Sequence, residues 1–162
     1  MSTMIKVGMA DLNICKYPDN ITTLGLGSCV GIALYDPVTK LGGLAHIMLP
    51  DSTQIRQNAN LAKFADTGIH ELIRLMQKNG AMKSRLVAKI AGGACMFAVR
   101  ENTSGIGNIG ARNVEAVKKK LKELGIPIKA EDTGLNYGRT VELHTDTGEF
   151  YIKSVGKSIK VI

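Results

Sequence analysis

A cysteine and a histidine, Cys29 and His46, stand in two strand-like segments that a short turn joins. The segments span residues 29–35 and 41–49, and the Asp-Pro dipeptide between them favours a type I turn over residues 36–39. Such a turn pairs residues whose numbers add up to 75, so Cys29 is expected to face His46. Directly opposed residues on one face have Cβ atoms about 4.5–5.5 Å apart, which allows contact between a thiol and an imidazole. The turn therefore predicts a catalytic pair.

The segment before the cysteine is rich in glycine, since residues 23–31 read TLGLGSCVG. Glycines let a substrate carbonyl approach the backbone and leave N–H groups free to line an oxyanion hole. Gly27 and Ser28 are the candidates for that role, Ser28 through its backbone N–H. In the chemistry that these residues suit, a thiolate attacks an amide carbon and an imidazole passes the thiol proton to ammonia. An imidazolium opposite Cys29 would also stabilise the thiolate.

A structural interpretation of the same residues stays open. Cys29 can be a small core residue, and the glycines can serve close packing between strands. The glycine-rich segment also resembles a phosphate-binding loop, but neither GxGxxG nor GxxxxGK[ST] is satisfied. The spacing alone thus leaves catalysis and packing as alternatives.

Periodicity places these residues in a layered fold. Apolar residues recur at helical spacing over residues 60–77 and 108–124, and the two stretches stop at Asn79-Gly80 and at Gly125. Besides the hairpin above, four segments have strand character: residues 86–91, 126–130, 139–144 and 149–155. We expect one α/β domain over residues 1–162, with mixed β-sheets and flanking helices.

Composition limits the cellular compartment and the kinds of partner that we expect for this protein. The chain has a formal net charge of +7 and three cysteines, with no CxxC pair. We therefore expect a reducing, cytoplasmic location, with no metal and no cofactor. No apolar run approaches the roughly 18 residues of a membrane span, so we expect no membrane insertion. The positive charge favours an acidic partner, and aromatic residues at 4% with no nucleic-acid motif argue against nucleic acid.

The order of short motifs resembles the CheD family of chemoreceptor glutamine deamidases. The resemblance spans nearly the whole chain, and TLGLGSCVG is followed by GLAHIMLPDS at residues 43–52. It continues through residues 63–67, 89–94, 108–113, 130–134 and 138–139. The family often has glycine where Leu135 stands, a departure outside the expected site.

The resemblance implies an amidohydrolase that converts selected glutamines of chemoreceptors (methyl-accepting chemotaxis proteins) to glutamate. It assigns catalysis to Cys29, His46 and Thr23, with Thr23 orienting the histidine. It also implies a CheC-type phosphatase as a partner, acidic receptor helices as substrate, and a fold like that of cytotoxic necrotizing factor toxins.

Two other functions compete with the deamidase. One is a catalytically silent module that docks onto CheC or receptors, for which Cys29 would be dispensable. The other is a basic nucleic-acid binder, whose binding would fall steeply with salt. For residues outside the expected site, we predict a structural ion pair between Asp132 and Arg139, a core position for Phe97, and a solvated face for the lysines at 118–122.

Overall fold

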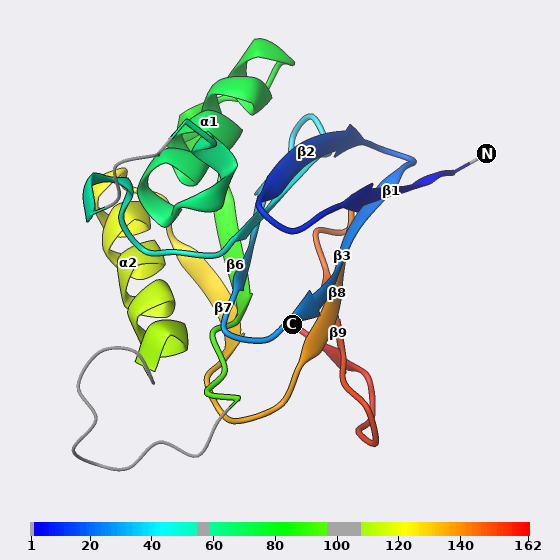
Figure 1. Ribbon diagram of the computed structural model, residues 1–162. Helices are drawn as coiled ribbons and strands as arrows, with labels where there is room; N and C mark the ends of the chain where they lie inside the picture. Colours follow the sequence, from blue (N-terminus) through cyan, green and yellow to red (C-terminus); the bar gives the residue numbers. More distant parts are fainter. Residues whose placement is uncertain (1, 55–58, 97–107) are drawn as a thin grey trace.

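The computed structural model describes residues 2–54, 59–96 and 108–162. Two five-stranded sheets face each other, and two helices cover the far side of one of them (Figure 1). One sheet lies between the helices and the second sheet, and we call it the central sheet. Its strands are, in order, β2 (Asp11–Lys16), β5 (Leu41–Ile47), β4 (Val30–Asp36), β6 (Val87–Gly92) and β7 (Ile128–Thr133). The outer sheet consists of β1 (Met4–Val7), β3 (Asn20–Leu26), β8 (Arg139–His144), β9 (Phe150–Lys153) and β10 (Lys160–Val161).

Both sheets are mixed, as the sequence predicts. The pairs β1–β3 and β6–β7 are parallel, and the remaining neighbours are antiparallel. Every residue of β4 and β5 is buried, because helices cover one face of the central sheet and the outer sheet covers the other. A strand covered on both faces has no polar side, which is why these two strands are apolar almost throughout.

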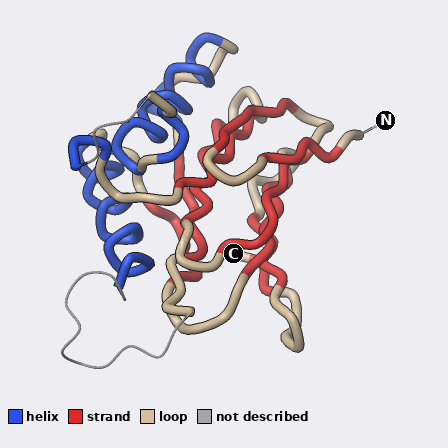
Figure 2. Tube along the Cα trace, viewed as in Figure 1, coloured by secondary structure: helices blue, strands red, loops and turns tan. Residues whose placement is uncertain are grey.

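The helices are α1 (Ala65–Lys78) and α2 (Ile109–Glu123), which pack side by side on the central sheet (Figure 2). The described residues also contain three short 3₁₀ turns: Ser52–Gln54, Leu61–Lys63 and Lys83–Arg85. In the described part of the chain, no helix is long and apolar enough to span a membrane. The prediction for α2 is confirmed within a residue at each end.

The first helix begins later than residue 60, where its apolar pattern starts. Phe64 is extended and pairs with Leu49, and Ala65 donates its N–H to the Leu49 carbonyl at 2.9 Å. This pairing interrupts the helical backbone, so Leu61 lies in a separate 3₁₀ turn and is 44% exposed. Tertiary pairing thus overrides the local periodicity at this end.

The predicted hairpin forms, but its register differs from the prediction. Asp36 pairs with Leu41, and the Lys40 N–H donates to the Asp36 carbonyl at 2.8 Å. The loop therefore holds four residues, and Lys40 takes the left-handed conformation with φ of 55°. Paired residues have numbers that add up to 77 rather than 75, so Gly31 faces His46. The predicted direct pairing of Cys29 with His46 is wrong by two residues.

Three strands near the N-terminus have no counterpart in the sequence predictions. Residues 20–26, expected to belong mostly to a glycine loop, form β3 between β1 and β8. Thr22 and Thr23 can be buried there because their hydroxyls donate to the backbone carbonyls of Val141 and Val7. Neither partner can be inferred from the local sequence.

Candidate active site

Cys29 lies where the chain passes from one sheet to the other. Leu26 is the last residue of β3 in the outer sheet, and Val30 is the first residue of β4 in the central sheet. Residues 27–29 bridge them without belonging to either strand. Cys29 is 7% exposed and packs among the residues between the two sheets.

Each carbonyl of this crossover is held by a different donor. The N–H of Ala94 donates to Gly27 at 2.9 Å, and the N–H of Gly93 donates to Cys29 at 2.8 Å. The Asn113 side-chain amide donates to the Ser28 carbonyl at 2.9 Å. Among the described residues, the backbone N–H groups of Ser28 and Cys29 make no hydrogen bond to another residue. The arrangement leaves donors available of the kind that an oxyanion requires.

His46 is held by a hydrogen bond between the two sheets. Its Nδ1 lies 2.7 Å from the Thr23 hydroxyl, and that hydroxyl donates its single proton to the Val7 carbonyl at 2.8 Å. Thr23 must therefore accept the second bond, which places the proton of the neutral imidazole on Nδ1. Nε2 is then an unprotonated acceptor, and it is buried without a hydrogen-bond partner in the described part of the chain. In this tautomer, the imidazole can act as a base through Nε2.

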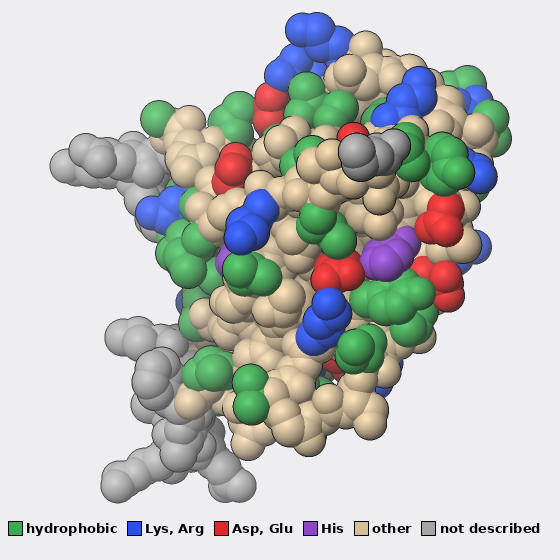
Figure 3. Space-filling view, turned by 90° about the vertical axis from the view of Figure 1, so that its right-hand side faces the viewer, with side chains coloured by type: hydrophobic (Ala, Val, Ile, Leu, Met, Phe, Trp, Pro, Cys, Tyr) green, Lys and Arg blue, Asp and Glu red, His purple; other side chains and the backbone are tan. Residues whose placement is uncertain are grey.

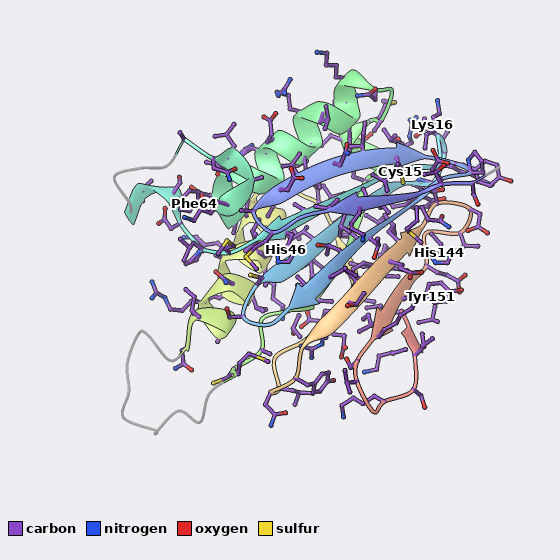
Figure 4. All side chains as sticks on the ribbon, turned by 45° about the vertical axis from the view of Figure 1, so that its right-hand side comes forward. Cys15, Lys16, His46, Phe64, His144 and Tyr151 are labelled. Atoms are coloured by element: carbon purple, nitrogen blue, oxygen red, sulfur yellow. The ribbon has the colours of Figure 1, made fainter. Side chains whose placement is uncertain are left out.

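The register places Cys29 one diagonal step from His46. Gly31 faces His46, and Cys29 stands two residues before Gly31. Because side chains alternate between the two faces of a sheet, a register shift of two residues keeps the Cys29 and His46 side chains on the same face. Diagonal neighbours on a sheet lie about 7–8 Å apart at their Cα atoms, which is within reach of an aromatic side chain such as that of His46. That face looks towards the outer sheet, which supplies Thr23. His46 lies well away from His144 and Tyr151, which stack on each other in the outer sheet (Figure 4).

Burial favours the neutral forms of both side chains. It raises the pKa of the Cys29 thiol, and only the thiol's own backbone N–H acts in the opposite direction. Burial also lowers the pKa of His46 from its ordinary 6.5. Burial therefore favours a thiol and a neutral imidazole over the thiolate and imidazolium considered from the sequence.

Gly92 allows β6 to pass close to the nucleophile's backbone. A Cβ atom at this position would lie 2.3 Å from the Cys29 carbonyl oxygen, and Gly92 has φ of +108°. On the other side of the crossover, a Cβ at Gly27 would meet the Met96 side chain at 3.3 Å. Glycine at position 92 is thus required by both the space and the backbone conformation.

Asn113 is a residue of the site that the sequence predictions missed. It is fully buried on α2 and donates to both the Ser28 and the Met48 carbonyls. The available signal was a polar residue on the apolar stripe of the helix, three residues after Gly110 and four before Val117.

The other predicted residues and the two remaining cysteines lie outside this site. The Asp132–Arg139 ion pair is confirmed at 3.1 Å, with Arg139 fully buried. Cys15 is a core residue whose pKa is raised to about 12 by burial and by Asp19, and Cys95 is half-buried. Phe97 lies outside the described residues. On α2, Lys118 and Lys120 form surface ion pairs, whereas Lys119 and Lys122 are exposed.

Comparisons with known proteins identify the family. Residues 48–154 match the family model described as CheD chemotactic sensory transduction. A protein of Lachnoclostridium phytofermentans is 63% identical over the full length of both chains, and one of Caldanaerobacter subterraneus subsp. tengcongensis is 56% identical over 99% of each. A Clostridium botulinum protein is 57% identical over 98% of this chain and 97% of its own. All three are named probable chemoreceptor glutamine deamidase CheD.

Among solved structures, the Bacillus licheniformis hypothetical protein YfiH has a TM-score of 0.41 and 19% identity, covering 72% of this chain and 47% of that one. The assignment therefore depends on the sequence matches, which extend over the whole length of the curated relatives. This chain belongs to the CheD family.

Proposed function

We propose that this protein is a cysteine-dependent glutamine deamidase that hydrolyses side-chain amides of selected chemoreceptor glutamines and releases ammonia. Its full-length relatives carry this activity in their names. The observation that carries the mechanism is the bond between His46 Nδ1 and the Thr23 hydroxyl, which itself donates to the Val7 carbonyl. This arrangement leaves Nε2, which has no partner among the described residues, as the acceptor. Such a histidine can take a proton from a neighbouring thiol without first losing one.

In the first half-reaction, His46 Nε2 takes the Cys29 thiol proton as the sulfur attacks the amide carbon of the glutamine. The carbonyl oxygen becomes an oxyanion, which the N–H groups of the crossover at Gly27, Ser28 and Cys29 can stabilise. The imidazolium then gives its proton to the amide nitrogen, the C–N bond breaks, and ammonia leaves a thioester on Cys29. Throughout, Nδ1 keeps its proton and its bond to Thr23.

In the second half-reaction, a water molecule attacks the thioester while His46 Nε2 takes one of its protons. The C–S bond breaks, the proton returns to the Cys29 sulfur, and glutamate is released. Thr23 suits both halves because a neutral hydroxyl orients the ring without stabilising its charged form. A carboxylate in that position would favour the imidazolium and weaken the resting base.

Several finer features belong to the same proposal. Residues 1–162 form one deamidase domain that works in the cytoplasm, where the free cysteines of the described chain suit a reducing environment. Its substrates are the cytoplasmic helices of chemoreceptors, and a CheC-type phosphatase is the partner that the family resemblance implies.

The test is mass spectrometry of a receptor cytoplasmic fragment incubated with the protein, with ammonia release measured in parallel. Wild type should convert particular glutamines to glutamate, and Cys29→Ala should convert none while keeping its fold and its binding to the fragment. Conversion by Cys29→Ala at the wild-type rate would refute the mechanism. Binding without conversion by wild type would favour the silent docking module instead.

A further inference from the structure

Asn113 uses both protons of its side-chain amide to join the two strands of the active site. Its Nδ2 donates to the Ser28 carbonyl and to the Met48 carbonyl, each at 2.9 Å. Ser28 precedes the nucleophile, and Met48 stands two residues after His46. One buried amide on α2 thus contacts the backbone on both sides of the proposed catalytic pair.

The contact occurs where the β4–β5 ladder ends. Val30 and Ile47 are its last pair, and Cys29 and Met48 would be the next. The chain leaves the sheet at this point, and the Asn113 amide supplies donors to carbonyls that no longer face a partner strand. The amide therefore holds the two strand ends at a fixed separation, at the place where the thiol and the imidazole must meet.

Holding the Ser28 carbonyl also fixes the direction of the Cys29 N–H. The two groups belong to one planar trans peptide, in which C=O and N–H point in opposite directions. Because the carbonyl is turned towards α2, the N–H is turned away from α2. Within residues 2–54, 59–96 and 108–162, that N–H has no acceptor in another residue.

The Asn113 side chain is unfavourable as a purely structural choice. Its Oδ1 is buried and has no hydrogen-bond partner in the described part of the protein. An unpaired buried acceptor is destabilising, and the neighbouring positions of the same helix face hold apolar residues such as Val117. The side chain does supply two N–H donors without a charge, which serine, threonine or a carboxylate cannot do.

We propose that Asn113 is a positioning residue for amide hydrolysis, which acts by turning the Cys29 N–H into the site as an oxyanion donor. The inference rests on the proposed deamidase function and adds to it a residue outside the Cys29, His46 and Thr23 set. Deleting an oxyanion donor outright costs about 10²- to 10³-fold in kcat. Loss of its orientation should cost less, on the order of 10- to 100-fold, with KM little changed.

The experiment compares Asn113→Ala and Asn113→Asp with Val117→Ala in the full chain. Val117 is fully buried on the same helix one turn away, so its truncation removes packing but no hydrogen bond. Urea unfolding of each variant gives the fraction folded, and kcat and KM are measured on the receptor fragment per folded molecule. The rate of Cys29 alkylation by iodoacetamide is followed against pH, because alkylation uses the thiol but needs no oxyanion donor.

Both Asn113 variants should lose kcat, and Val117→Ala should keep its kcat. The midpoint of Cys29 alkylation should rise in the Asn113 variants only, because the N–H that Asn113 orients also lowers the pKa of the thiol. Asn113→Asp has the shape of asparagine but no donor when ionised, so it should not rescue the rate. Wild-type kcat in Asn113→Asp, or equal kcat in Asn113→Ala and Val117→Ala, would overturn the inference. If wild type itself released no ammonia, the proposed function would fail instead.

A measurement on the wild-type protein covers the case in which the variants do not fold. Both side-chain amide protons of Asn113 are hydrogen-bonded and buried, so they should exchange with solvent slowly in amide NMR spectra. Exchange as fast as that of the Asn79 side-chain amide, which donates to the Leu75 carbonyl at an exposed position, would contradict these two buried hydrogen bonds.

Discussion

At the scale of single residues, the positions of two protons define the proposed chemistry. The Thr23 proton goes to Val7, so the His46 Nδ1 proton goes to Thr23 and Nε2 remains a base. Burial disfavours the thiolate of Cys29 and the imidazolium of His46. In the proposed chemistry, charge develops during attack, when the N–H groups of the crossover can stabilise it.

Truncating the base should cost more than truncating its orienting group. His46→Ala removes the proton acceptor and should lower kcat/KM by about 10²- to 10⁴-fold. Thr23→Val keeps the shape of the side chain and removes only the hydroxyl, so its loss should be smaller. Initial rates on one receptor fragment measure both. A Thr23→Val defect larger than that of His46→Ala would mean that the two roles are wrongly assigned.

The pH dependence should follow the neutral form of His46. Because burial lowers the pKa of this imidazole below 6.5, the base stays active as the pH falls through 6.5. The acid limb of kcat/KM should therefore have its midpoint below pH 6.5, with a plateau above it. Circular dichroism at each pH separates loss of activity from unfolding. A midpoint above 6.5 would point to an imidazolium stabilised by a thiolate.

At the scale of elements, the crossover from β3 to β4 creates the site. Its three carbonyls are bound by donors from the segment after β6 and from α2, so distant parts of the chain fix its shape. Gly92 has no side chain, and this allows the end of β6 to contact the Cys29 carbonyl.

Gly92→Ala should therefore damage the site as well as the fold. The new methyl group would lie 2.3 Å from the Cys29 oxygen, and alanine is strained at φ of +108°. Gly125→Ala is the matched control, because it has φ of +72° and nothing within 4 Å of the added Cβ. We expect backbone strain to destabilise both variants by about 1 kcal/mol or more, but only Gly92→Ala should lose kcat per folded molecule. Equal kcat in the two variants would rule out a role for this close approach.

At the scale of the whole molecule, a net charge of +7 is spread over a surface of mixed sign. Figure 3 shows one face on which Lys and Arg side chains lie among Asp and Glu. On α2, the exposed Lys119 and Lys122 stand beside two lysines that pair with glutamates. Attraction to an acidic receptor helix would therefore be a long-range property of the net charge, to which α2 contributes.

Binding to the receptor fragment should weaken as ionic strength rises, since the screening length falls to about 10 Å at 0.1 M salt. Titration by fluorescence anisotropy at several salt concentrations measures the slope. Reversing Lys119 and Lys122 to glutamate should lower affinity about as much as reversing Lys16 and Lys78, because both pairs change the net charge equally. An affinity independent of salt would remove charge steering from the mechanism.

The local features of this protein follow from its sequence alone. Helical periodicity located α2 within a residue, strand character located β8, and turn chemistry brought residues 29–35 against 41–49. These features depend on interactions between residues close in the chain, so the pattern of apolar and turn-forming residues predicts them. It also determined the face of Cys29 relative to His46, because the register error of two residues preserves the side of the sheet.

The tertiary structure alone decided the environment of the pair. The four-residue turn set the register, Thr23 reached His46 from the other sheet, and Asn113 reached Ser28 from a helix 85 residues further along the chain. Burial between the two sheets then favours the neutral forms of both side chains over the ion pair expected for a thiol beside a histidine. Contacts of this range and the loss of solvent leave no periodic trace in the sequence, because they depend on how layers pack rather than on neighbouring residues.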